Sequence, residues 1–297
     1  MMREAFALWQ ALQAEAGEPL IEPCGVLWLG DADDPELHAI AHALQSEQVA
    51  YEWLDSPALA TRFPALRLEP HERALFQSEG GFLRASACVL ANLRLAEAHG
   101  AHIHEQARIA RVEPRPDGIW LETESGMRER FDRVLLTAGA WLPKLLPQLD
   151  LPLTVTRQTY AYFAVRPESM PDFAPARMPV WIEATRHFYG FPSDGRQAGI
   201  KVAWHRLGTV QDPDAPVRPV DEEDLAPLRA CLARRLPNAL PDGLDTATCL
   251  YTIAPDERFL LKPLPNELRV WLVSACSGHG FKFSILNAWH AVQQLMA

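Results

Sequence analysis

The chain has 297 residues, of which 48% are hydrophobic and 22% are charged, and its formal net charge at neutral pH is −10. A chain of this length and composition can bury a large core in one large domain or in two interleaved domains, which argues against a disordered protein. Nucleic-acid binding depends on Lys and Arg side chains that neutralise phosphates, so the negative balance argues against a nucleic-acid partner.

Membrane and metal binding are also disfavoured. No apolar run approaches the ~18–20 residues that cross a bilayer, so no membrane partner is expected. The amino terminus lacks the apolar segment and cleavage site of a signal peptide, and we therefore expect a cytoplasmic protein. The cysteines are odd in number and contain no C-x-x-C pair, which predicts neither a disulfide framework nor a metal site; they are Cys24, Cys88, Cys231, Cys249 and Cys276.

The first part of the chain alternates predicted helices with short strands. Apolar residues at helical spacing predict a helix over residues 4–16, and Gly17 supplies its end. A second helix follows Asp34, which is an N-cap residue in front of Pro35. The remaining predicted elements are strands over residues 24–29, 51–54 and 101–104 and a helix over residues 82–99.

An antiparallel meander is predicted next, because three short strand patterns are separated by turn residues. These strands cover residues 107–112, 119–123 and 127–131, and the turns contain Pro116-Asp117-Gly118 and Ser125-Gly126. Residues 134–141 then read as a buried strand that ends in a glycine turn at Gly139.

The second half begins with longer strand patterns, which suit an antiparallel sheet with one covered face. They cover residues 152–165 and 180–191 and continue at residues 199–204. A helix is expected over residues 221–236, with a leucine stripe that packs in the core. Its cap is Asp221 or, preferentially, Asp224, because Pro227 is tolerated in a first helical turn.

The last fifth of the chain predicts a strand, a tight turn and a helix. The apolar run at residues 268–276 fits a strand that is buried on both faces, and it ends at Gly278 and Gly280 before a helix that reaches Met296. The amino end of such a helix favours an anionic or electron-rich ligand. The two styles of element alternate along the chain, which predicts an α/β domain and an antiparallel-sheet domain that the chain crosses between.

Two strands each present a pair of reactive side chains on one face, because side chains alternate along a strand. Cys249 and Tyr251 form one pair, and Lys201 and His205 form the other. Spacing alone leaves the ordinary alternatives open, namely a small buried cysteine and a solvated strand face.

These segments resemble a known family. Thr248-Cys249-Leu250-Tyr251-Thr252, Asp256-Glu257-Arg258-Phe259 and residues 277–284 (SGHGFKFS) closely resemble the carboxy-terminal part of the monomeric sarcosine oxidase and N-methyl-tryptophan oxidase group of the FAD-dependent D-amino-acid-oxidase (DAO) superfamily. The resemblance implies an α/β plus α+β fold, with an incomplete Rossmann-like FAD-binding layer domain of glutathione-reductase type interleaved with an antiparallel-sheet substrate domain. The implied FAD-binding domain comprises residues 1–20, 82–150 and 256–297, and the implied substrate domain comprises residues 21–81 and 151–255.

The resemblance also implies roles for individual residues. It makes Cys249 the covalent attachment point of the flavin in a complete protein, and Lys201 the residue that promotes the reaction with dioxygen. It places His205, Tyr189 and Tyr251 in the catalytic pocket. The implied cofactor contacts lie in two turns and comprise Gly139, Ala140, Trp141, Gly278, His279, Gly280, Phe281 and Lys282, of which Lys282 also faces the substrate.

The implied reaction is FAD-dependent oxidation of a small N-methylated or cyclic secondary amino acid such as sarcosine, with dioxygen as the acceptor and hydrogen peroxide as the product. N-methyl-tryptophan oxidation is the nearest alternative, because the pocket lining that separates the two substrates cannot be assembled from the sequence. A catalytically silent remnant or interaction subunit without bound FAD is a further alternative.

The chain departs from the family pattern in two respects. It contains no G-x-G-x-x-G turn for the FAD pyrophosphate, and the family's substrate-carboxylate arginine is not found. Either the sequence is an incomplete gene product, or a partner or upstream segment supplies the pyrophosphate site. On this basis the 297 residues are expected to fold only partly and to bind FAD weakly or not at all.

Overall fold

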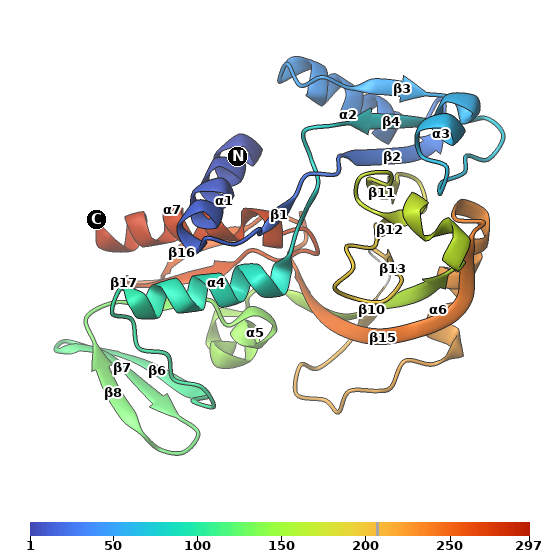
Figure 1. The fold of residues 1–297 in the computed structure, drawn as a ribbon. Helices are drawn as coiled ribbons and strands as arrows, with labels where there is room; N and C mark the ends of the chain where they lie inside the picture. The colour runs from blue at the N-terminus through green and yellow to red at the C-terminus, as the bar shows by residue number, and fades with distance from the viewer. Residues whose placement is uncertain (206–207) are drawn as a thin grey trace.

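The protein is described by a computed structural model that covers residues 1–205 and 208–297. Within these residues the largest sheet has nine strands. Eight follow the order β14-β10-β13-β12-β11-β2-β4-β3, and the ninth, β15, pairs with β10 along its length (Figure 1). Its strands are β2 (Val26–Asp31), β3 (Glu52–Leu54), β4 (Glu72–Gln77), β10 (Thr154–Val165), β11 (Val180–Glu183), β12 (Phe188–Phe191), β13 (Ile200–Trp204), β14 (Thr209–Val210) and β15 (Ala239–Ile253).

Three smaller sheets lie outside this one. The strand β9 (Val134–Leu136) pairs in parallel with β17 (Glu267–Ser274), which pairs with β16 (Leu260–Leu264). The meander consists of β6 (Ile109–Arg115), β7 (Gly118–Thr123) and β8 (Arg128–Phe131), and β1 (Ile21–Glu22) pairs with β5 (Phe82–Leu83). The predicted mixture of α/β and α+β architecture is therefore confirmed.

The helices divide between the large sheet and the smaller sheets (Figure 1). They are α1 (Met2–Ala16), α2 (Pro35–Ser46), α3 (Ser56–Arg62), α4 (Ala85–Ala98), α5 (Leu142–Leu145), α6 (Glu222–Arg235) and α7 (Ser284–Met296), with short 3-10 turns η1 (Gly139–Trp141), η2 (Pro147–Leu149), η3 (Pro167–Phe173) and η4 (Phe281–Phe283). In the described part of the chain no helix is long and apolar enough to cross a membrane.

Helix α6 closes one face of the large sheet. Leu228 and Leu232 pack in one buried cluster with Phe163 of β10 and with Ile200 and Val202 of β13. The predicted role of the leucine stripe is confirmed. Because neighbouring residues of a strand point to opposite faces, residues such as Lys201 are directed to the face away from α6.

Several predicted elements are confirmed at their ends as well as in their type. Helix α1 ends at Gly17, which has the left-handed φ of 69°. The Asp34 side chain caps α2 by accepting from the amides of Glu36 and Leu37. The meander forms at the predicted position in the chain.

Three predictions about strands and helix limits are wrong. Residues 180–191 are two antiparallel strands, β11 and β12, because a turn with His187 at φ 59° reverses the chain. Residues 82–83 pair with β1 and are not helical. Residues 101–104 form no strand, because the amide of Ala101 donates to Ala96 O and thereby completes the end of α4.

Two further expectations are corrected in the second half. The preferred cap Asp224 is wrong, because Asp221 caps α6 by accepting from the amide of Asp224. The Asp224 carboxylate in turn accepts from the amide of Asp221, and Pro227 lies inside the helix. The apolar strand β17 is not buried on both faces. Val270 and Leu272 are fully buried, whereas Leu268 is 74% exposed, because the strand packs fully only on one side.

A buried ion cluster joins α6 to the large sheet. The Arg235 guanidinium is 1% exposed and pairs with both Glu72 of β4 and Glu183 of β11. Arg234 also donates to Glu183, at 2.8 Å. Burial opposes ionisation of Glu72. The hydrogen bonds from Arg235 and from the Glu69 amide, together with the charges of Arg235 and Arg186, outweigh burial and hold the pKa of that carboxyl below its ordinary value of 4.5.

We expect Arg235→Ala to destabilise the protein by about 3–5 kcal/mol, because it leaves two buried carboxylates without their counter-charge. The matched control is Arg229→Ala on the same helix, since its partner Glu222 is exposed and the pair should be worth less than ~1 kcal/mol. Urea unfolding measures both differences in the free energy of unfolding, and equal losses would contradict the assignment.

The same cluster predicts a pH dependence. The folded-state pKa of Glu72 is lowered, so its contribution to stability is present above the unfolded pKa and is lost as the pH falls through the acid range. The acid loss of stability should be smaller in Arg235→Ala than in the unaltered chain. Urea unfolding at several pH values below about 5 tests this.

Candidate active site

Most of the predicted catalytic residues lie on one face of the large sheet, as the pairing of its strands shows. Residues that are directly paired across two strands lie on the same face. The relevant pairs are Lys201 with Tyr162 and with Phe191, Ala203 with Tyr160 and with Tyr189, Cys249 with Gln158, and Tyr251 with Thr156. The predicted residues Lys201, Tyr189, Cys249 and Tyr251 therefore share the face opposite α6.

The ammonium group of Lys201 lies among aromatic rings. Its Nζ is 4.2 Å from the ring centroid of Tyr160 and 5.4 Å from that of Phe191. Burial lowers the pKa of the Lys201 ammonium, and the nearby Cys249 partly opposes this effect. The protein thus holds a desolvated cation on this face, where it can stabilise negative charge that develops in a reaction.

Two phenols and an imidazole lie beside this lysine strand. The hydroxyl of Tyr251 hydrogen-bonds that of Tyr189, and burial raises the pKa of both phenols. The His205 ring lies 5.7 Å from the Tyr251 ring. Both tyrosines are therefore neutral hydrogen-bonding groups near physiological pH.

The glycine turn after β17 packs directly against these rings. A Cβ atom at Gly278 would lie 2.4 Å from Tyr251 Cε2 and 2.4 Å from His205 Cε1, and the residue has a φ of 73°. Ser277 fixes the turn to the end of β15, because its amide donates to Thr252 O at 2.9 Å and its Oγ accepts from the amide of Ala254 at 3.2 Å. Only glycine fits this approach without displacing the neighbouring rings.

Helix α1 holds the other end of the turn. The indole Nε1 of Trp9 donates to Lys282 O at 2.8 Å, and its ring stacks on Phe281 at 5.8 Å. The Lys282 residue has an exposed surface, yet desolvation by the protein around its ammonium lowers its pKa. His279 packs against Phe259 at 5.2 Å. The turn is therefore fixed from both sides.

The thiol of Cys249 is accessible from solvent on the same face. Despite this access, the surrounding protein raises its pKa by desolvation, and the charge of Lys201 acts in the opposite direction. The thiol is consequently protonated at neutral pH, and deprotonation is favoured by any further positive charge nearby.

The second predicted cofactor turn lies beside β15. Strand β15 packs against η1, which contains Gly139, Ala140 and Trp141. Gly139 has a φ of 52°, and no atom lies within 4 Å of the position of a Cβ there. Trp141 Nε1 donates to Asp214 at 2.8 Å, so this side chain is directed to a surface loop. The turn thus leaves open space at its glycine.

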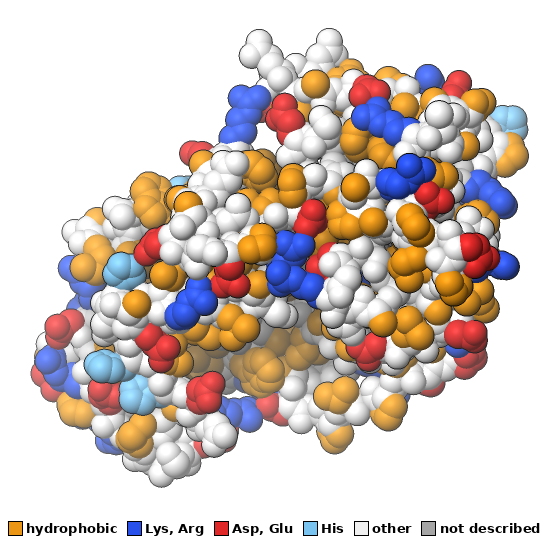
Figure 2. Space-filling view, viewed as in Figure 1, with side chains coloured by type: hydrophobic (Ala, Val, Ile, Leu, Met, Phe, Trp, Pro, Cys, Tyr) orange, Lys and Arg blue, Asp and Glu red, His pale blue; other side chains and the backbone are white. Residues whose placement is uncertain are grey.

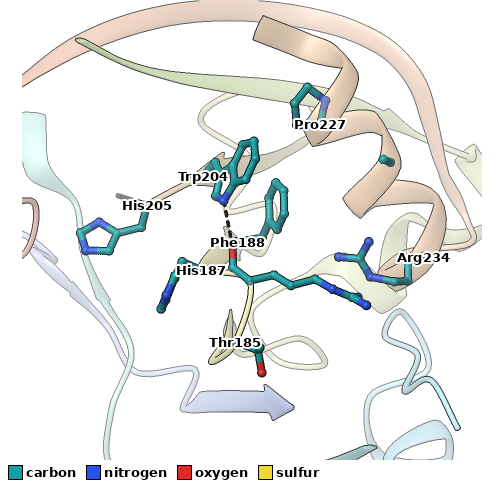
Figure 3. A pocket seen from close by; sticks show the side chains of 9 residues that line it. Thr185, His187, Phe188, Trp204, His205, Pro227 and Arg234 are labelled. Atoms are coloured by element: carbon teal, nitrogen blue, oxygen red, sulfur yellow. Dashed lines mark hydrogen bonds between the residues drawn. The ribbon is translucent and has the colours of Figure 1, made fainter. Parts of the chain in front are cut away.

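A cavity of about 650 Å³ lies elsewhere, beside α6 (Figure 3). It is lined by Thr185, Arg186, His187, Phe188, Trp204, His205, Pro227, Ala230 and Arg234. The Trp204 indole stacks on Phe188 at 4.6 Å and donates to Arg186 O at 2.8 Å. Of the described residues that we predicted for the site, only His205 lines this cavity, which therefore lies apart from the sheet face that carries Lys201 and Cys249. The space-filling view instead shows a hollow with hydrophobic side chains between the surface over α4 and α5 and the surface over β10 and β15 (Figure 2).

The sequence did not identify Tyr160, Phe191, Ser277 or Trp9 as parts of this site. The alternation of Tyr160 and Tyr162 in one strand pattern was a usable signal for an aromatic face. Trp9 had no such signal, because its partner Lys282 O is 273 positions away in the chain.

Comparison with known proteins gives consistent results. The model of the family described as "DAO: FAD dependent oxidoreductase" matches residues 1–294. The chain is 30% identical over 288 residues to monomeric sarcosine oxidase of Streptomyces avermitilis, covering 95% of this chain and 74% of that protein. It is 32% identical over 291 residues to N-methyl-L-tryptophan oxidase of Salmonella arizonae, covering 96% and 75%.

Solved structures support the fold alone. The open form of NikD, an amino acid oxidase of nikkomycin biosynthesis, matches with a TM-score of 0.83 and 23% identity, over 99% of this chain and 78% of that chain. Fructosamine oxidase (Amadoriase II) of Aspergillus fumigatus matches with a TM-score of 0.83 and 20% identity, over 99% and 71%.

We expect Gly278→Ala to destabilise the protein by about 2–4 kcal/mol, because it adds a clash with two rings to the strain of a left-handed residue. Gly126→Ala is the control: Gly126 also has a positive φ, of 85°, but no atom lies within 4 Å of its Cβ position, so the cost should be about 1 kcal/mol. Thermal unfolding compares the two variants. Equal losses would show that the rings of His205 and Tyr251 move aside freely.

Proposed function

The chain belongs to the DAO family of FAD-dependent oxidoreductases, and from this we propose that it oxidises a secondary, N-methylated amino acid such as sarcosine, with dioxygen as the acceptor and hydrogen peroxide as the product. The observation that carries the proposal is the single sheet face that presents Lys201, Cys249, Tyr189 and Tyr251 together. Relatives named monomeric sarcosine oxidase support the reaction class.

The residues on this face fit a flavin ring. A flavin that becomes reduced accumulates negative charge, and Lys201 is a desolvated cation for which the described residues provide no carboxylate partner. The accessible thiol of Cys249 is the only described cysteine on this sheet face, and it offers an atom for a covalent bond. Open space at Gly139 allows a ligand to approach the backbone of η1.

When bound, the flavin supplies the redox chemistry, accepting two electrons and a hydrogen from the carbon next to the amine nitrogen. The chain's own residues bind and orient the flavin and the substrate, and they provide charge. Lys201 places a positive charge where dioxygen gains negative charge, and in a desolvated setting such a charge acts strongly. Gly278 keeps the turn close enough to define one edge of the site.

We assign the substrate side to Lys282 and the ring cluster. Lys282 carries a cation on the turn that Ser277 and Trp9 fix, which suits a substrate carboxylate. Tyr189, Tyr251 and His205 form a wall with neutral hydroxyls and an imidazole, which suits a small amine. His279 and Phe281 serve to hold the turn rather than to contact substrate.

N-methyl-tryptophan oxidation is a second candidate, because N-methyl-L-tryptophan oxidases are as similar to this chain as sarcosine oxidases are. The residues proposed above serve both reactions alike. The ratio of kcat/KM for sarcosine to kcat/KM for N-methyl-L-tryptophan decides between them.

We further propose that the domains follow the predicted division. Residues 1–20, 82–150 and 256–297 would hold the cofactor, and residues 21–81 and 151–255 would hold the substrate. The strands of the large sheet all fall within the second set, which supports the division. The pairing of β1 with β5 crosses the boundary at residue 82 and joins the two parts.

The covalent bond gives the first test of this function. In a version that also has the FAD pyrophosphate site, flavin fluorescence should remain on the protein in a denaturing gel and should disappear in Cys249→Ser, because no thiol is left at this position. Cys276→Ser is the control, since Cys276 is the neighbouring thiol next to the glycine turn. Attachment should also speed up between pH 7 and 9, by roughly tenfold per pH unit, because the pKa of Cys249 is raised and the thiolate is scarce at neutral pH. Retention of fluorescence in Cys249→Ser would overturn the assignment.

Half-reactions give the second test. Lys201→Met should slow reoxidation by dioxygen about 10²-fold or more, while reduction by the amine should change less than about tenfold, because the lost charge acts on dioxygen. Lys262→Met, on the exposed side of β16, is the matched control. Stopped-flow absorbance follows both steps. Equal slowing of the two half-reactions would assign Lys201 to substrate binding instead.

A further inference from the structure

The Lys201 ammonium has an unusual set of neighbours. Among the residues that the structure describes, it makes neither an ion pair nor a hydrogen bond, and its contacts are two ring faces. The Tyr160 centroid is 4.2 Å away and the Phe191 centroid is 5.4 Å away. A cation this close to a ring face is attracted by the ring's negative quadrupole.

Strand pairing explains why the Tyr160 ring reaches the lysine. Tyr160 on β10 pairs with Ala203 on one side and with Ala247 on the other, and both are small. Lys201 is two residues from Ala203, which makes it the diagonal neighbour of Tyr160, within reach of a long side chain and an aromatic ring. The two alanines therefore leave room for the ring to lie beside the ammonium.

Phe191 and Tyr162 complete the arrangement. Phe191 is the residue of β12 that pairs directly with Lys201. Tyr162 pairs with Lys201 from β10, and its ring meets the Tyr160 ring edge-on, at 6.2 Å and 78°. Tyr162 thus supports Tyr160 from the side.

Other titratable groups face Lys201 from three strands. They are Cys249, Tyr251 and Asp245 on β15, Tyr160 and Tyr162 on β10, and Tyr189 on β12. The Asp245 carboxylate is bound by Gln197 at 2.7 Å. Burial raises the pKa of Tyr160, so its ring is a neutral phenol and not a counter-ion. Ring faces are therefore the main compensation for the desolvation of the lysine.

We propose that Tyr160 is a positioning residue. Its ring face, together with that of Phe191, holds the Lys201 ammonium in place on the sheet face opposite α6 and keeps the ammonium positively charged. We call the ring faces of Tyr160 and Phe191 the aromatic cage, and this cage follows from the geometry of the chain itself. Its consequence for dioxygen rests on the proposed function, in which Lys201 provides charge to the reaction.

The test is the pKa of Lys201 in the flavin-free chain, measured by competitive acetylation and mass spectrometry of the Lys201 peptide. Tyr160→Phe should leave this pKa within about 0.3 unit, because it keeps the ring face. Tyr160→Leu should lower it further, by ~0.5–1.5 units, because the charged form loses the ring. Phe191→Leu should give a smaller decrease, since that ring is more distant.

Tyr162→Leu is the control, because it removes a ring from the same face that does not contact the Lys201 ammonium. It should change the pKa of Lys201 by less than either Tyr160→Leu or Phe191→Leu. Tyr160→Met provides a second ring-free variant that fills the volume if Tyr160→Leu unfolds, and thermal unfolding identifies that case. An unchanged or raised pKa in the folded ring-free variant overturns the cage. A decrease in Tyr160→Phe as large as in Tyr160→Leu also overturns it, because it would assign the effect to the hydroxyl.

The rate of flavin reoxidation tests the cage separately from the proposed function. In the flavin-loaded protein, Tyr160→Leu should slow reoxidation and should have little further effect when Lys201→Met is already present. A lowered Lys201 pKa without any amine oxidation would keep the cage and reject the proposed function. A reoxidation defect with an unchanged Lys201 pKa would reject the cage and keep the function.

Discussion

The backbone pairing of β10 with β15 is the constraint on which the rest of the site depends. The two strands run antiparallel from the Thr154–Ile253 pair to the Val165–Ala239 pair, and the register shifts only near Tyr162 and Phe163. Because side chains alternate, a slip of one residue would move Cys249 and Tyr251 to the α6 face and would separate them from Lys201. The nearly unbroken ladder makes such a slip costly, since every hydrogen bond of the pair would have to be rebuilt.

The two faces of the large sheet differ in role: one packs against α6, and the other carries polar and charged groups. On the α6 face, apolar residues and the buried Arg235 cluster fix the helix to the sheet. A buried ion pair contributes little net stability compared with an apolar contact, but the loss of one partner is severe. The cluster therefore favours one placement of α6 over others. This leaves the opposite face free to carry polar and charged groups at fixed positions.

The sequence predicted which residues share a strand face, but it could not predict which strands are neighbours. Period-two alternation was enough to pair Cys249 with Tyr251 on β15. His205 lies beyond the end of β13 and lines the cavity beside α6, so its pairing with Lys201 stays a prediction. The diagonal contact between Tyr160 and Lys201 depends on long-range pairing of β10 with β13, which no local pattern contains. The same limit explains the incorrect strand over residues 180–191: both halves have strand composition, and only the reversal at His187 separates them. Asp221 was one of the two predicted caps of α6, and Asp224 was wrongly preferred because Pro227 was expected to lie in the first helical turn.

The lysines explain why this face is suited to chemistry. Both Lys201 and Lys282 have a lowered pKa because the surrounding protein removes water from them. In a chain with a net charge of −10, carboxylates are abundant, yet none of the described ones pairs with either ammonium. An ion pair would stabilise the charge in the resting protein and would weaken its effect on a ligand, because the field of the cation would already be neutralised. Ring faces hold the ammonium of Lys201 without neutralising it. In the proposed function, the positive charge therefore stays available for negative charge that arises during the reaction.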